Sequence, residues 1–109
     1  MARPRTERVE LGPALAARVA LVLEAQAGVL EQYDRLSGGR LSEQHRAEAR
    51  RLARAARELR AGRPAVVEAV YVRTAAYDLD PAVGRLVPDR WVFEVTPDGT
   101  FRPAARRGG

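Results

Sequence analysis

His45 is the only histidine of the chain and the first side chain to consider for catalysis. An imidazole can act as a base or bind a metal near neutral pH. No second histidine, cysteine or nearby carboxylate pair gives it the spacing of a metal site. Neither Ser37 nor Ser42 lies in a nucleophile-elbow sequence. His45 falls on the apolar stripe of a predicted helix, so we expect a packed imidazole at the end of the core.

Three aspartates near a predicted loop form a second candidate site. Asp78, Asp80 and Asp89 can offer carboxylates to a divalent cation, and Mg²⁺ often needs only one or two from the protein. However, Asp80 precedes Pro81, and aspartate before proline between two strands is ordinary turn chemistry. The sequence therefore predicts a turn here, no metal site and no cofactor.

Glu68 and Glu94 lie on two predicted neighbouring strands and form a third candidate. Two carboxylates facing each other can perform acid–base hydrolysis. Arg73 and Arg90 are close in sequence, and a cross-strand ion pair on the sheet surface is the favoured interpretation. None of the three candidates assembles a catalytic set, so we predict that the protein is not an enzyme.

Two helices are predicted before residue 62. Apolar residues recur at steps of three and four over residues 13–36, and Ser37-Gly38-Gly39 ends that pattern. Ser42 is the expected N-cap of a second helix that ends before Gly62. The apolar stripe of the second helix is Ala49, Leu52, Ala56 and Leu59. The short connection predicts an antiparallel helical hairpin over residues 13–61.

After Pro64 the residue types change to those of strands. Residues 65–73 are rich in valine and tyrosine and predict a strand that can run to Tyr77, followed by a loop over residues 78–89. Residues 90–96 predict a second strand, and Pro97-Asp98-Gly99 predicts a hairpin turn back toward Arg102. The expected sheet covers residues 65–103.

The expected fold class is α+β. An antiparallel two-helix hairpin packs on a small antiparallel sheet of about three strands, in the order ααβββ. We expect one domain over residues 9–103, a basic flexible arm at residues 1–8 and a basic flexible tail at residues 104–109.

The positive charge of the chain is concentrated in the second predicted helix. Residues 37–63 hold eight arginines and three glutamates, against a net charge of +5 for the whole chain. Four arginines share one stripe at helical spacing: Arg46, Arg50, Arg54 and Arg57. One interpretation is a phosphate-binding face of a small nucleic-acid-binding protein. The other is a solvated face, because all 19 basic residues are arginine while isoleucine, asparagine and cysteine are absent, as in a GC-rich bacterial genome.

The predicted strand at residues 65–73 is apolar on both faces, and this short chain offers cover for only one of them. An uncovered apolar patch on a soluble protein usually marks an interaction site. We therefore predict a non-enzymatic protein-interaction module that is a homodimer or a small subunit of a larger assembly, with nucleic-acid binding as the alternative. The predicted contact residues are Val66, Val70, Val72, Trp91 and Phe93.

A cytoplasmic location without membrane contact is expected. The absence of cysteine fits a reducing compartment. Arg18 interrupts the apolar stretch that a signal peptide requires, and Glu7 and Glu10 lie in its otherwise basic start. No run of about 18 uninterrupted apolar residues predicts a membrane-spanning helix.

Overall fold

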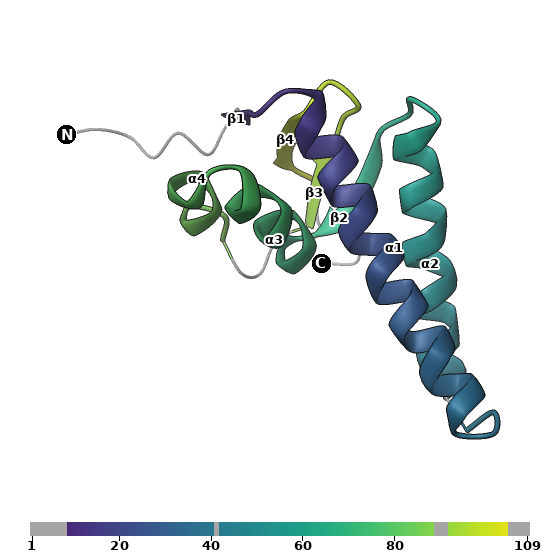
Figure 1. The fold of residues 1–109 in the computed structure, drawn as a ribbon. Coiled ribbons are helices and arrows are strands. Elements are labelled where there is room, and N and C mark those ends of the chain that lie inside the picture. The colour runs from purple at the N-terminus through teal and green to yellow at the C-terminus, as the bar shows by residue number, and fades with distance from the viewer. Residues whose placement is uncertain (1–8, 41, 89–91, 105–109) are drawn as a thin grey trace.

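A computed structural model describes residues 9–40, 42–88 and 92–104 (Figure 1). The elements in the described residues are β1 (Val9–Glu10), α1 (Pro13–Leu36), α2 (Glu43–Arg60), β2 (Ala65–Glu68), α3 (Ala69–Leu79), α4 (Pro81–Arg85), β3 (Val92–Val95) and β4 (Thr100–Pro103). The expected arm, the tail beyond Ala104 and Trp91 lie outside the described residues.

The two long helices begin and end where their sequences predict. Pro13 is the first residue of α1, where its missing N–H costs nothing, and Gly38 and Gly39 follow the helix with positive φ. The Ser42 hydroxyl accepts a hydrogen bond from the backbone N–H of His45 and caps α2. Helices α1 and α2 lie side by side and run antiparallel, so the helical hairpin is confirmed.

The sheet has the strand order β1-β4-β3-β2, and every pair in it is antiparallel. Strands β2, β3 and β4 have four residues each, whereas β1 has only two. The turn between β3 and β4 is the predicted one, with Gly99 at a φ of 93°. Gly99 also accepts a hydrogen bond from the N–H of Leu11 and lies so close to Gly12 that no side chain fits between them.

The prediction of one long strand after Pro64 is wrong, because β2 ends at Glu68 and the chain continues as α3. A helix forms here in place of the expected strand because the buried residues recur at a helical spacing: Ala69, Val72, Ala75 and Ala76. Burial of this apolar stripe outweighs the strand propensity of valine and tyrosine. The predicted loop at residues 78–89 is also partly helical, since it contains the end of α3 and all of α4. The class α+β is confirmed, but the order ααβββ is wrong.

One core joins all the layers. The largest fully buried side chains are Phe93, Leu15, Leu23, Val19, Val72 and Val95. The rings of Phe93 and Phe101 pack edge to face, with centroids 5.4 Å apart. Helix α3 packs against α1 and contacts β2 and β3. Both α2 and α3 therefore contact the sheet, whereas α1 packs against these two helices.

The hairpin extends well beyond the sheet (Figure 1). With 24 residues, α1 is about 36 Å long at 1.5 Å per residue. The end of the hairpin near the α1–α2 connection has neither sheet nor α3 beside it in Figure 1. Contrary to expectation, α1 is by length and composition apolar enough to cross a membrane, a property that core helices of soluble proteins share.

Candidate functional site

The predicted contact residues do not form one surface. Val72 and Phe93 have no exposed surface, so they belong to the core and that part of the prediction is wrong. Val66 on β2 and Val70 on α3 are exposed, and Trp91 lies outside the described residues. The physical reason is the helix at Ala69–Leu79, which turns Val72 inward and Val70 outward.

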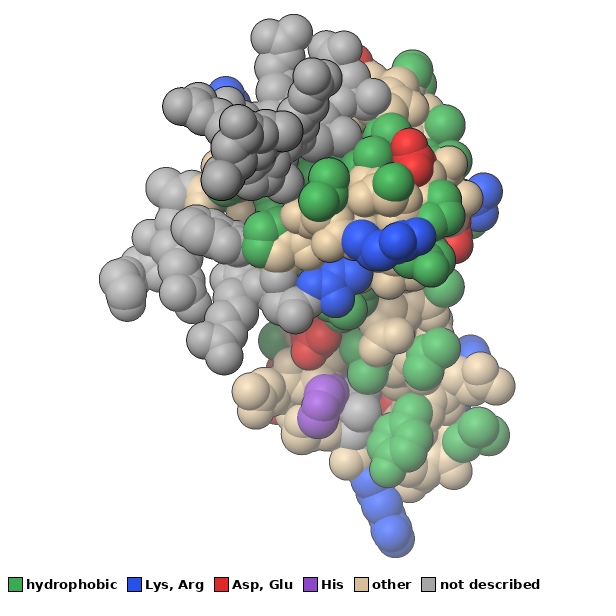
Figure 2. Space-filling model, turned by 90° about the vertical axis from the view of Figure 1, so that its left-hand side faces the viewer, with side chains coloured by type: hydrophobic (Ala, Val, Ile, Leu, Met, Phe, Trp, Pro, Cys, Tyr) green, Lys and Arg blue, Asp and Glu red, His purple; other side chains and the backbone are tan. Residues whose placement is uncertain are grey.

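An exposed apolar surface lies instead at the far end of the helical hairpin. A groove there, which we call the distal groove, is lined by Val29, Leu30, Tyr33, Arg40, Ser42 and His45. Val29 is 58% exposed and Tyr33 is 59% exposed, while Leu36 nearby on α1 is 79% exposed. Figure 2 shows this end at the bottom, with the purple histidine side chain beside green hydrophobic side chains.

The apolar pattern of α1 predicts that these residues belong to the core face of the helix. The proximal part of that face is indeed buried, because Leu15 and Val19 have no exposed surface and α3 packs against α1. Tyr33 follows Leu15 by about five helical turns and continues this face, whereas Val29 lies at its edge, on the side of exposed Ala25. The length of α1 was the missed signal, since about 36 Å of apolar helix exceeds what a four-residue strand and an 11-residue helix can cover.

His45 is exposed, so the prediction of a packed imidazole is wrong. Its Nδ1 lies 2.8 Å from the Ser42 hydroxyl oxygen, within hydrogen-bond distance. The first turn of α2 lies beyond the core, and in Figure 1 no described element other than α1 lies beside it. The imidazole is thus a polar wall of the distal groove.

The charge around the distal groove is positive. Arg40 lines it, and within the described residues its guanidinium has no ion-pair partner. No carboxylate of the described chain lines the groove. Two acids adjoin lining residues and are paired with arginines of α2, since Asp34 lies 3.2 Å from the guanidinium of Arg46 and Glu43 lies 2.9 Å from that of Arg50. An occupant of this groove therefore meets apolar side chains bordered by an available cation.

The arginine stripe of α2 divides into two halves. Arg46 is bound by Asp34 and by Glu43, and Arg50 is bound by Glu43 at 2.9 Å. Arg54 and Arg57 make no ion pair with any residue that the structure describes. The two unpaired arginines are exposed and lie toward the C-terminal end of the helix.

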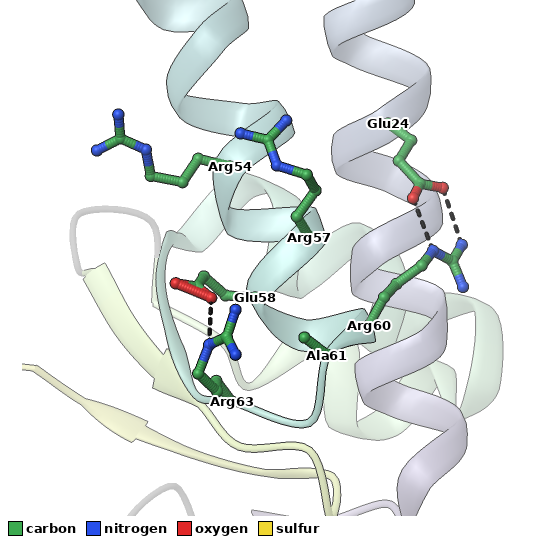
Figure 3. A pocket seen from close by; sticks show the side chains of 7 residues that line it. All are labelled: Glu24, Arg54, Arg57, Glu58, Arg60, Ala61 and Arg63. Atoms are coloured by element: carbon green, nitrogen blue, oxygen red, sulfur yellow. Dashed lines mark hydrogen bonds and ion pairs between the residues drawn. The ribbon is translucent and has the colours of Figure 1, made fainter.

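A shallow open depression, which we call the arginine depression, surrounds the unpaired pair (Figure 3). Its lining residues are Glu24, Arg54, Arg57, Glu58, Arg60, Ala61 and Arg63. Both carboxylates are engaged, Glu24 by Arg60 at 2.6 and 2.8 Å and Glu58 by Arg63 at 2.5 Å. The hydrogen bonds from Arg60 hold the pKa of the Glu24 carboxyl below its ordinary value.

The carboxylates considered for acid–base chemistry are each paired with an arginine. Glu68 lies 2.7 Å from a guanidinium nitrogen of Arg51, and Glu94 lies 2.8 Å from one of Arg102 on the neighbouring strand. The predicted cross-strand ion pair is thus present at Glu94, although its partner is neither Arg73 nor Arg90. Each of these two carboxylates is held by a cation.

One aspartate of the predicted loop, Asp80, has a structural role. The Asp80 carboxylate accepts a hydrogen bond from the N–H of Ala82 at 3.1 Å and caps α4. Asp89 lies outside the described residues. Among the residues that are described, no group of three or more His, Cys, Asp or Glu side chains gathers in the manner of a metal site.

No protein-family model matches the sequence, and comparisons with curated proteins and with solved structures give no match.

Proposed function

We propose that this protein is a non-enzymatic protein-interaction module that binds an apolar helix of a partner protein in the distal groove. The observation that carries the proposal is an apolar groove at the end of the hairpin. In it Tyr33, on the same line of α1 as buried Leu15, is 59% exposed beside exposed Val29. A groove between two helices is a common receptor for an amphipathic helix. The occupant would cover the distal part of α1 as α3 covers the proximal part.

The charge around the groove specifies the partner further. Arg40 lines the groove without an ion-pair partner among the described residues, and Arg35 in the last turn of α1 is exposed. A partner helix with carboxylates flanking its apolar stripe complements these cations. A second copy of the chain is the alternative occupant. The sequence predicts self-association, although through the sheet region and not through this groove. Two copies would bring the same arginines together, so opposite charge favours a different protein.

Two synthetic helical peptides test this proposal. Both carry leucine at the same helical spacing, and their flanking positions hold glutamate in one and lysine in the other. We expect the glutamate peptide to shift the backbone amide signals of residues 29–45 in NMR titrations of the full chain. The lysine peptide should bind at least tenfold more weakly, since each like-charge contact costs free energy.

A matched pair of variants locates the contact. Val29→Asp and Val70→Asp each add one carboxylate to a helix, at valines that are 58% and 57% exposed. Val29→Asp should abolish binding of the glutamate peptide, whereas Val70→Asp should leave it unchanged. Equal effects of the two variants, or equal binding of the two peptides, would contradict the proposal.

A further inference from the structure

We propose that Arg54 and Arg57 form a second binding site, which holds backbone phosphates of duplex nucleic acid without reading the base sequence. This site lies outside the distal groove, and the proposal does not depend on the function of that groove. It separates two arginines of the predicted stripe from the two that have acidic partners.

Arg54 and Arg57 differ from the other arginines of the stripe because their guanidinium groups have no ion-pair partner among the described residues. Arg46 and Arg50 already have carboxylate partners, and Arg60 and Arg63 have theirs within the arginine depression. A phosphate that approached those residues would have to displace a carboxylate. At Arg54 and Arg57, within the described residues, it would displace only water.

The geometry suits neighbouring phosphates. Residues three apart on a helix lie on one face, with a rise of about 4.5 Å along the axis. Figure 3 shows both side chains extending from α2 around the arginine depression without a bonded neighbour. The remaining lining arginines neutralise Glu24 and Glu58, so the carboxylates present little free negative charge to an arriving phosphate.

The surroundings favour a duplex over other phosphate carriers. The arginine depression is shallow and open, so it cannot enclose a single phosphate. None of its described lining residues is aromatic, so the bases of a single strand would have no aromatic ring to stack on. Ala61 is the only apolar residue in that lining, so a lipid tail finds no apolar cover.

The experiment measures binding of a labelled short DNA duplex to the full chain by fluorescence anisotropy over a range of salt concentrations. The test variant is R54Q/R57Q. The control is R18Q/R85Q, which removes the same charge from two exposed arginines that also lack ion pairs among the described residues. A single strand of the same sequence and inorganic phosphate at constant ionic strength serve as competitors.

We expect R54Q/R57Q to weaken duplex binding at least tenfold and to reduce the slope of log K against log salt by about 1.8, or about 0.9 for each phosphate that is no longer neutralised. The control should change affinity by less than half as much on a logarithmic scale. Equal losses of affinity in both variants would show a general charge effect and overturn the site. Tighter binding of the single strand, or displacement of the duplex by inorganic phosphate alone, would overturn the assignment to a duplex.

Discussion

Glu24 and Arg60 join the two long helices through two hydrogen bonds between one carboxylate and one guanidinium, 2.6 and 2.8 Å long. The residues are 36 positions apart in sequence. A fork-to-fork contact of this kind fixes relative orientation as well as distance. It therefore links the middle of α1 to the C-terminal end of α2.

The first prediction concerns the pH dependence of this pair. The pKa of Glu24 is lowered in the folded state, chiefly by the hydrogen bonds from Arg60. Its contribution to stability is therefore complete above the ordinary carboxyl pKa and is lost as pH falls through the lowered value. Glu24→Gln should reduce the free energy of unfolding near neutral pH, and the difference from wild type should shrink in acid.

Urea unfolding at several pH values measures this difference, and both residues are exposed enough that the effect should be small. Glu31→Gln is the control, since Glu31 lies exposed on the same helix without a described partner. A pH-independent difference between wild type and Glu24→Gln would rule out the ionised carboxylate as its source.

The second prediction distinguishes the observed helix α3 from the strand expected from sequence. Val72→Ala removes two buried methyl groups and should cost about 2 kcal/mol of unfolding free energy. Val70→Ala changes an exposed side chain and should be neutral or slightly stabilising, since alanine is the better helix former. Chemical unfolding of both variants measures the difference, and similar losses of stability would contradict the helix.

The third prediction concerns two glycines within helices. A Cβ at Gly84 would lie 2.7 Å from the Cα of Tyr77, which is backbone and cannot give way easily. Gly84→Ala should therefore lower stability by about 1–3 kcal/mol. A Cβ at Gly28 meets nothing within 4 Å, so Gly28→Ala should raise stability by about 1 kcal/mol. Thermal unfolding compares the two, and a stabilising Gly84→Ala would mean that α3 and α4 lie further apart.

The fourth prediction concerns self-association. If the distal groove receives a different, acidic protein, the isolated chain should be a monomer in light scattering after size exclusion. A dimer that Val29→Asp dissociates and Val70→Asp leaves intact would assign the groove to a second copy instead. A dimer insensitive to Val29→Asp would place self-association on another surface, with exposed Val66 as the next residue to change.

The long helices were predictable because their sequence signals agree. In α2, the cap at Ser42, the buried stripe of alanine and leucine and the stop at Gly62 all indicate the same element. In α3 two signals conflict, since Val66 to Val72 favour a strand by residue type and only the burial of Ala69 and Val72 supports a helix. Burial depends on tertiary packing, which residue type alone does not specify.

The candidate sites were predictable only in part. The arginine stripe is visible in the sequence, but which half has partners depends on Asp34 of α1 and on the geometry of Glu43. The distal groove was not predicted, because helical periodicity shows that a face is apolar without showing how far its cover extends. The exposure of His45 was missed for the same reason.

The close approach of Gly99 to Gly12 holds the chain next to the pairing of β1 with β4, and this matters for local unfolding of the sheet edge. Strand β1 has two residues, and its partner residues Val9 and Phe101 are separated by most of the chain. Such a distant pairing forms late and is easily released. When this pairing is lost, β4 becomes an unpaired sheet edge that can pair with another chain. The contact between Gly12 and Gly99 therefore opposes aggregation by keeping β1 in place.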